Sequence, residues 1–136
     1  MSQEGKLFSL PIRVYFQDTD AGGVAYHASY LNFMERARTE WLRTHGYSNA
    51  GLMKEFGVVF VVRSLKLDYL KPALLDDMLN VTAQIKDIGR SRISLLQTVS
   101  RGDEVLTEAE VHLVCVSLES FKPVSVPEVL REQWKN

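Results

Sequence analysis

The stretch ASYLNFMERARTEWLRTH, residues 28–45, decides how the rest of the sequence is interpreted. Its apolar side chains recur at intervals of three and four residues, as on one face of an α-helix. They are Tyr30, Leu31, Phe33, Met34, Ala37, Trp41 and Leu42. Gly46 then follows as a helix stop. The pattern predicts a helix about 27 Å long, and no other part of the sequence predicts a long one.

Extended segments surround this helix. Phe8 to Gln17 alternates apolar and polar residues, which predicts a strand with one buried face, and Pro11 favours an edge or strand-start position. The later strand-like segments are joined by short turns and cover residues 58–70, 78–88, 92–101 and 105–118. A short helix is expected after Pro127. This order predicts an α+β fold, an antiparallel five-stranded sheet packed against one helix.

Composition narrows the class of protein. The 136 residues are 46% hydrophobic, and their formal net charge of −1 does not suggest a nucleic-acid surface. The single cysteine, Cys115, excludes an intrachain disulfide and a cysteine-based zinc cluster within one chain. No linker or repeat divides the sequence, so a single domain over residues 1–136 is expected. No signal-peptide pattern or membrane span is visible, so we expect a soluble, cytoplasmic protein.

Two of the expected strands are apolar on both faces. Val58 to Val62 is a continuous apolar run, and Val111 to Leu118 is interrupted only by His112 and Ser117. One helix covers only one face of a sheet, so the other face needs a different cover. We interpret this as a homo-oligomer in which a second subunit supplies the cover. The alternative is a strongly curled sheet.

The densest polar cluster is DTDAGGVAYH, residues 18–27, between the first strand and the helix. A calcium loop is rejected because the fifth and twelfth positions hold Gly22 and Ser29. A Walker-type phosphate loop is rejected because Val24 follows the glycine pair. Two interpretations stay open: a structural turn with a helix cap, or a carboxylate beside a helix start that stabilises a developing oxyanion.

A family resemblance bears on this choice. The run VYFQDTDAGGVAYHASYL, residues 14–31, resembles the signature of hotdog-fold thioesterases of the 4-hydroxybenzoyl-CoA thioesterase class. The continuation MERARTE, residues 34–40, is similar to the YbgC branch, the Tol-Pal-associated acyl-CoA thioesterases. Further similar stretches are FVVR at 60–63, LDDML at 75–79, EAEV at 108–111 and VCV at 114–116.

The resemblance implies a hotdog fold, in which the sheet wraps around one long central helix. It also implies a homodimer or homotetramer with active sites at subunit interfaces. The implied activity is hydrolysis of acyl-CoA to a free acid and CoA, with no metal or other cofactor. Acyl carrier protein is an alternative acyl donor or partner in this family. A non-hydrolytic acyl-CoA or acyl-carrier-protein binding module and a hotdog-fold dehydratase remain the alternative functions.

The resemblance also implies roles for individual residues. Asp20 is the catalytic base or nucleophile, and Asp18 shapes the loop. Backbone N–H groups near His27 form the oxyanion hole, and the His27 side chain assists. The implied substrate-binding residues are Tyr26, Arg90, Ser91 and Arg92, the last three for the CoA phosphates, with Lys71 a weaker candidate. A solvated hairpin is the alternative for Arg90 to Arg92.

Three positions depart from the YbgC pattern. Phe16 stands where many members have Tyr, Gln17 where they have Glu, and Ala25 where Val is usual. A role for a phenol hydroxyl at position 16 is therefore not available to this chain.

The remaining chemically capable residues are expected to be structural. His45 and His112 show no metal-ligand spacing, and Cys115 lies in an apolar strand as an inert thiol. Arg38 falls at the edge of the apolar arc of the helix. It is interpreted either as a snorkelling side chain or as a buried ion pair with Glu35 at a subunit interface.

Overall fold

The computed structural model describes residues 6–134 of the chain. The strands are β1 Phe8–Arg13, β2 Val58–Tyr69, β3 Met78–Ile88, β4 Arg92–Arg101 and β5 Glu104–Ser117. The helices are α1 His27–Thr44, α2 Asn49–Phe56 and α3 Glu128–Trp134, and a 3₁₀ turn spans Phe16–Asp18.

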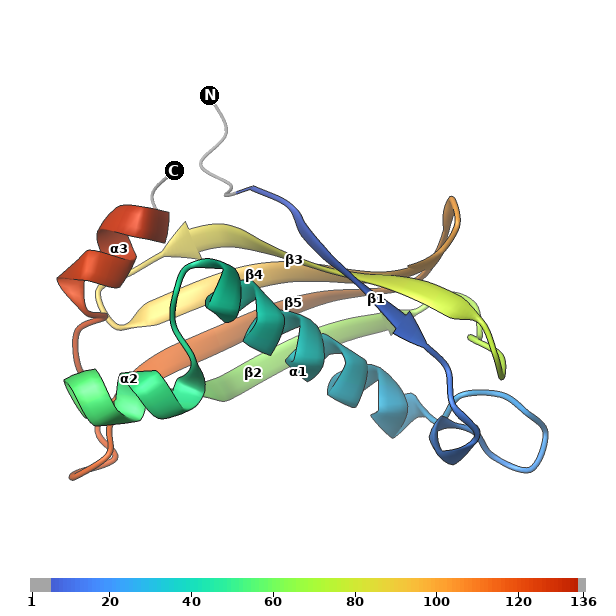
Figure 1. Cartoon of the computed structure of the whole chain (residues 1–136), viewed down its shortest axis with the longest axis horizontal. Helices are drawn as coiled ribbons and strands as arrows, with labels where there is room; N and C mark the ends of the chain where they lie inside the picture. The colour runs from blue at the N-terminus through green and yellow to red at the C-terminus, as the bar shows by residue number, and fades with distance from the viewer. Residues whose placement is uncertain (1–5, 135–136) are drawn as a thin grey trace.

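The five strands form one sheet in the order β1-β3-β4-β5-β2, and every neighbouring pair is antiparallel. β1 and β2 are therefore the two edges. The predicted α+β class and the five-stranded antiparallel sheet are confirmed, while the observed order adds α2 between the 18-residue helix α1 and the last four strands. In Figure 1 the loop between β1 and α1 lies at the opposite end of the molecule from α2 and α3.

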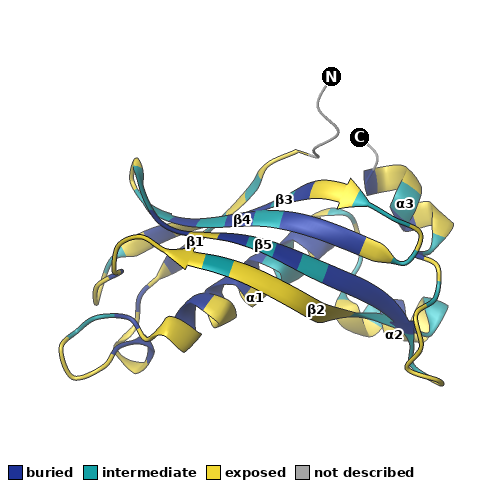
Figure 2. Cartoon of the chain, turned by 180° about the vertical axis from the view of Figure 1, so that it is seen from behind, coloured by how far each residue is buried: buried dark blue, intermediate teal, exposed yellow. Residues whose placement is uncertain are grey.

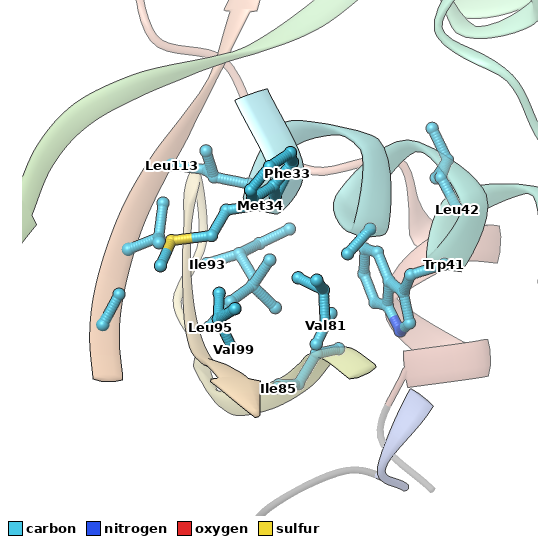
Figure 3. Close-up of a cluster of buried hydrophobic side chains, with 14 of the residues drawn as sticks. Phe33, Met34, Trp41, Leu42, Val81, Ile85, Ile93, Leu95, Val99 and Leu113 are labelled. Atoms are coloured by element: carbon cyan, nitrogen blue, oxygen red, sulfur yellow. The ribbon is translucent and has the colours of Figure 1, made fainter. Parts of the chain in front are cut away.

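α1 lies against one face of the sheet through its apolar stripe. Its buried apolar residues are Tyr30, Phe33, Met34, Ala37, Trp41 and Leu42. They meet side chains from β3, β4 and β5, as Figure 3 shows for Phe33, Met34, Val81, Ile93 and Leu113. Burying a side chain of this size contributes roughly 1.5–3 kcal/mol, so the stripe holds the helix on the sheet. Leu31, expected on the stripe, is 42% exposed and does not belong to it.

The first strand is shorter than its alternation predicted. β1 ends at Arg13, and Phe16, expected on the buried face, is 80% exposed. The reason is local: the carboxylate of Asp18 accepts a hydrogen bond from the N–H of Tyr15 at 2.8 Å and turns the chain. The period-2 pattern therefore continues in the sequence after the strand itself has ended.

α2 was not predicted, although its end signals are present in the sequence. The Ser48 side chain caps the helix by accepting a hydrogen bond from the N–H of Gly51. Gly57 ends it in the left-handed conformation, with φ 65°, which glycine adopts without steric cost. A helix of eight residues is too short for its periodicity to stand out.

The two edges of the sheet differ in exposure. β1 is short and carries Pro11, which has no N–H to offer to another strand. β2 is twelve residues long, and Val61 and Val62 are 41% and 49% exposed. Figure 2 shows β2 exposed along most of its length beside the largely buried β5. Within residues 6–134, no helix combines the length and the apolarity that crossing a membrane requires.

Candidate active site

The two aspartates of the DTD motif have different surroundings. Asp18 is 6% exposed. Its carboxylate accepts from the N–H of Tyr15, and its backbone carbonyl accepts from the N–H of Tyr26 and the hydroxyl of Ser29, both at 2.9 Å. These contacts close the loop onto the first turn of α1, so Asp18 shapes the loop.

Asp20 is exposed, and one of its two carboxylate oxygens accepts hydrogen bonds. Its Oδ1 accepts from the N–H of Gly22 at 2.8 Å and of Val24 at 3.4 Å. Its backbone N–H donates to the Val24 carbonyl, and its carbonyl accepts from the N–H of Gly23. Gly23 has φ 77°, a conformation that favours glycine. Within residues 6–134, Oδ2 accepts no hydrogen bond, so this carboxylate is held by one oxygen while the other faces solvent.

The start of α1 presents free backbone donors. Tyr26 occupies the N-cap position with an extended backbone and makes no side-chain capping bond. The backbone N–H groups of His27 and Ala28 have no acceptor among the described residues. Such a helix start carries a partial positive charge and attracts a developing negative charge. It therefore has the properties of an oxyanion hole.

The ring of His27 is fixed by a residue that the sequence analysis missed. Tyr69, the last residue of β2, stacks on His27 with ring centroids 4.2 Å apart and an angle of 18°. Its hydroxyl donates to the backbone carbonyl of His27 at 3.1 Å. The two residues are 42 positions apart, so only the fold brings them together and no sequence signal announces the contact.

A cleft of about 210 Å³ opens beside His27. Its lining comes from the loop, from α1 and from the end of β2 with the residues that follow: Val24, Ala25, His27, Tyr30, Tyr69, Leu70, Lys71 and Pro72. Burial and the neighbouring Tyr30 raise the pKa of Tyr69, which keeps its hydroxyl a hydrogen-bond donor. Asp20 does not line this cleft directly. It is linked to the cleft through its bond to Val24.

The Arg90–Arg92 cluster lies at the other end of the sheet in the same chain. Arg13 of β1 pairs with Met78 at the start of β3, so the Asp20 loop is at that end. Arg90 follows the far end of β3, which has eleven residues, about 33 Å of strand. There Arg90 donates from Nε to the Ser125 hydroxyl at 2.9 Å, and the carbonyl of Ser91 accepts from the N–H of Cys115. One chain therefore does not bring Arg90, Ser91 and Arg92 to Asp20.

The larger cavity, about 430 Å³, also lies at that far end. It is lined by the second half of α1, by α2, by the first half of β2, and by single residues of β4, β5 and α3. Its apolar lining includes Trp41, Leu42, Met53, Phe60, Val62, Ile93, Leu113 and Trp134. This volume falls in the range of small-molecule pockets.

Arg38 lies on the wall of this cavity. It makes no ion pair with Glu35 but donates to Oε1 of Gln97 at 2.9 Å. Burial lowers the pKa of Arg38, and the charge of Glu35 opposes this effect. The expected ion pair is replaced by a hydrogen bond to a buried amide.

The other chemically capable residues make structural contacts. His45 packs against Trp41 and Trp134. His112 bonds Ser94 at 2.8 Å and Glu110 at 2.9 Å. Cys115 is buried, and burial raises the pKa of its thiol to about 11, so the thiolate nucleophile is scarce at neutral pH. Across residues 6–134, no three His, Cys, Asp or Glu side chains are grouped so that they could hold a metal ion.

Comparison with known proteins agrees with this geometry. The sequence pattern of the thioesterase-like superfamily matches residues 14–134. The chain is 47% identical over 130 residues to the acyl-CoA thioester hydrolase YbgC of Escherichia coli O6:H1, covering 95% of this chain and 96% of that one. It is 44% identical over 124 residues to the acyl-CoA thioesterase YbgC of Haemophilus influenzae, covering 91% of each chain.

A solved structure shows the same fold. The probable thioesterase from Bartonella henselae superimposes with a TM-score of 0.86 at 34% identity, over 90% of this chain and all of that one. The hotdog fold implied by the sequence resemblance is thereby confirmed. The chain belongs to the thioesterase-like superfamily and, within it, to the YbgC proteins.

Proposed function

We propose that the protein is an acyl-CoA thioesterase that hydrolyses acyl-CoA to a free carboxylic acid and CoA. The observation that carries the proposal is the loop that joins a half-engaged carboxylate, Asp20, to a helix start with unpaired N–H groups at His27 and Ala28. The activity for which the YbgC relatives are named, acyl-CoA thioester hydrolysis, supports the same reaction.

In the proposed reaction the thioester carbonyl oxygen accepts hydrogen bonds from the free amides at the start of α1. The helix dipole and these donors stabilise the negative charge that develops on this oxygen. Asp20 either takes a proton from the attacking water or attacks the carbonyl carbon itself. The C–S bond then breaks, CoA leaves as the thiol after protonation, and water supplies the second oxygen of the acid. Tyr69 holds His27 beside the reacting group, and Tyr26 forms part of the substrate surface.

A second copy of the chain completes the proposed site. The exposed edge β2 offers unpaired backbone groups and apolar side chains to an identical strand. In a two-fold antiparallel pairing, the Tyr69 end of one β2 lies beside the Val58 end of the other. This brings the 430 Å³ cavity and the Arg90–Arg92 turn of one copy towards the Asp20 loop of its partner. We propose that each chain, folded as a single domain over residues 1–136, contributes half of each site.

The test is release of CoA thiol from acyl-CoAs of short, long and aromatic acyl groups, by wild type and Asp20→Asn in parallel. Asparagine keeps the shape of the side chain but loses the charge, and the expected fall in kcat is about 10²–10⁴-fold. Turnover by wild type with a folded, nearly inactive variant supports the proposal. Binding of acyl-CoA without thiol release indicates a binding module, and loss of water from a hydroxyacyl-CoA indicates a dehydratase. Full activity in Asp20→Asn contradicts the role of Asp20.

A further inference from the structure

The loop that carries Asp20 rests on a second segment, far away in sequence. We call residues 70–77, which join β2 to β3, the brace segment. The N–H of Ala25 donates to the Ala73 carbonyl, and the N–H of Leu75 donates to the Gly23 carbonyl, both at 2.9 Å. The Tyr30 hydroxyl accepts from the N–H of Ala73 at 2.8 Å. The position of the Asp20 loop therefore depends on the position of the brace segment.

The brace segment contains a residue in an unfavourable backbone conformation. Asp76 has φ 72°, in the left-handed region that residues other than glycine seldom adopt. The Asp76 carbonyl accepts from the guanidinium of Arg13 at 2.7 Å. The Asp77 carboxylate accepts from the N–H of Leu74 at 2.8 Å, which closes the turn. The N–H of Asp77 also donates to the Leu74 carbonyl, so the segment keeps its shape through its own turn together with contacts from outside it.

Backbone bonds to Leu106 and Val14 hold the two ends of the segment, and Arg101 makes more side-chain hydrogen bonds to it than any other residue among those described. Arg101 ends β4, and its Nη1 donates to Oδ2 of Asp77 at 2.6 Å and to the Pro72 carbonyl at 3.4 Å. Its Nη2 donates to Oε1 of Glu104 at 2.6 Å, and Oε2 of Glu104 accepts from Nζ of Lys71 at 2.7 Å. One guanidinium thus holds both ends of the brace segment, directly at Pro72 and Asp77 and through Glu104 at Lys71.

The same contacts reach the cleft beside His27. Lys71 and Pro72 line that cleft, and Ala25, bonded to the brace segment, lines it as well. The hydrogen bonds of Arg101 to two carboxylates raise its pKa, so it stays charged wherever the protein is folded. An ion-pair cluster that is partly exposed contributes little to stability. Its effect on the geometry of the loop is separate, because Gly23 and Ala25 of the loop bond directly to the brace segment.

We propose that Arg101 is a positioning residue, which acts through the brace segment to fix the Asp20 loop and one wall of the substrate cleft. This inference rests on the proposed function of Asp20 for its effect on catalysis. The mechanical link between Arg101 and the loop is independent of that function and is measured separately.

The experiment compares Arg101→Met and Arg101→Lys with Lys86→Met. Methionine keeps the bulk without charge, and lysine keeps the charge without the fork that binds two carboxylates at once. Lys86 pairs with Glu110 at 2.7 Å on strands of the same sheet, so it is a matched ion pair without contact to the brace segment. Two readouts are taken: hydrogen exchange of the peptides covering residues 20–27 and 70–77, and kcat and KM for the acyl-CoA that wild type hydrolyses fastest.

In Arg101→Met we expect faster exchange in both peptides and a kcat lower by about tenfold, because a small displacement of a reacting group is costly in rate. KM should change less than kcat, Arg101→Lys should recover part of the loss, and Lys86→Met should resemble wild type in both readouts. If Arg101→Met does not fold, Glu104→Gln, which weakens the same cluster, takes its place.

Unchanged exchange in the two peptides would overturn the proposal. Faster exchange in Arg101→Met with an unchanged kcat would also overturn it, provided that Asp20→Asn is inactive. An equal loss of activity in Lys86→Met would also overturn it, because the effect would then not depend on the brace segment. If instead Asp20→Asn keeps its activity, the proposed function has failed, and the exchange data alone decide the link between Arg101 and the loop.

Discussion

The two ends of α1 are built for different tasks. Its N-terminal end has unpaired amides, an exposed carboxylate in a closed loop, and a cleft of about 210 Å³. Its C-terminal half, with Trp41 and Leu42, borders a largely apolar cavity of about 430 Å³. The first end therefore offers a carboxylate and backbone donors beside a small cleft, and the second offers a cavity of about twice that volume with an apolar floor and a polar wall that includes Arg38 and Thr39.

The difference is explained if, as proposed above, each end of α1 contributes half of a thioesterase site, because one chain does not join the two ends. α1 and β2 run in opposite directions, since Tyr69 at the end of β2 contacts His27 at the start of α1. A two-fold pairing through β2 places unlike ends together. The two ends of α1 are thus far apart in a single chain, and we propose that the oligomer brings the unlike ends of two chains together.

The largest effect is expected from mixing two inactive variants. Asp20→Asn removes the polar half, and Thr39→Trp fills the cavity, which Thr39 lines. Each variant alone should lose activity towards long acyl-CoAs. Refolded together at equal concentration, they should recover about a quarter of wild-type activity, because half of the dimers are mixed and each holds one intact site.

Thiol release by the mixture measures this recovery, with Thr39→Ser as the control that should stay active. A mixture as inactive as its components would show that both halves of a site come from one chain.

The next effect concerns β2, the sheet edge that is proposed to join two copies of the chain. Val61→Asp places a charge on the exposed strand β2, where pairing with a second copy would bury it. The dissociation constant of the oligomer should rise by at least about tenfold, which corresponds to about 1.4 kcal/mol. Sedimentation or light scattering measures this shift, and Ser9→Asp on the opposite edge β1 is the control. Equal weakening by both variants would contradict the assignment of β2 as the joining edge.

A smaller effect separates the two aspartates at the polar end. Asp18→Ala leaves the N–H of Tyr15 without its acceptor, so the free energy of unfolding should fall by about 1–3 kcal/mol. For a chain of this length, that lowers Tm by roughly 3–12 °C. Asp20→Ala should hardly change Tm but should abolish turnover. Thermal unfolding of both variants is the measurement, and a larger Tm loss in Asp20→Ala would reverse the two roles.

The smallest effect is a dependence of stability on pH, which we expect from His45 just after the C-terminal end of α1. Burial lowers the pKa of His45, which packs against Trp41 and Trp134. As the pH falls below about 6.5, the ordinary pKa of histidine, the unfolded chain therefore binds a proton at His45 before the folded chain does. The contribution of neutral His45 to stability is full above that pH and is lost as the pH falls towards the folded pKa. In this pH range the Tm of His45→Gln should depend less on pH than the Tm of His112→Gln. If His45→Gln leaves the dependence of Tm on pH unchanged, His45 contributes nothing to it.

The regular elements could be predicted from the sequence because their periodicity is strong. The apolar spacing of residues 28–45 identified α1, and the later strands fall close to the predicted ranges. The end of β1 was not predictable from alternation alone, since the bond from Tyr15 to Asp18 overrides it. α2 could have been found from Ser48 and Gly57, which carry the N-cap and C-terminal signals.

The candidate site was only partly accessible from the sequence. Asp20, Tyr26 and His27 lie in one short run, so a motif reveals them together. Tyr69, the brace segment and Arg101 reach the site through contacts between residues that are far apart in the chain. Such contacts depend on strand order, which local patterns do not determine. The opposite placement of Arg90 and Asp20 follows from the β1–β3 register in the same way.

The exposed edge β2 also has a consequence for a newly made chain. In the proposed homo-oligomer, a chain that has not yet met a second copy carries a long strand with an apolar first half and one unpaired side, and any other extended segment competes for that side. The hazard lasts as long as the search for a partner, and that time shortens as the concentration of identical chains rises. Chains made side by side on one messenger RNA would meet soonest. The yield of native protein should therefore depend on how close together identical chains are synthesised, as well as on the stability of the folded protein.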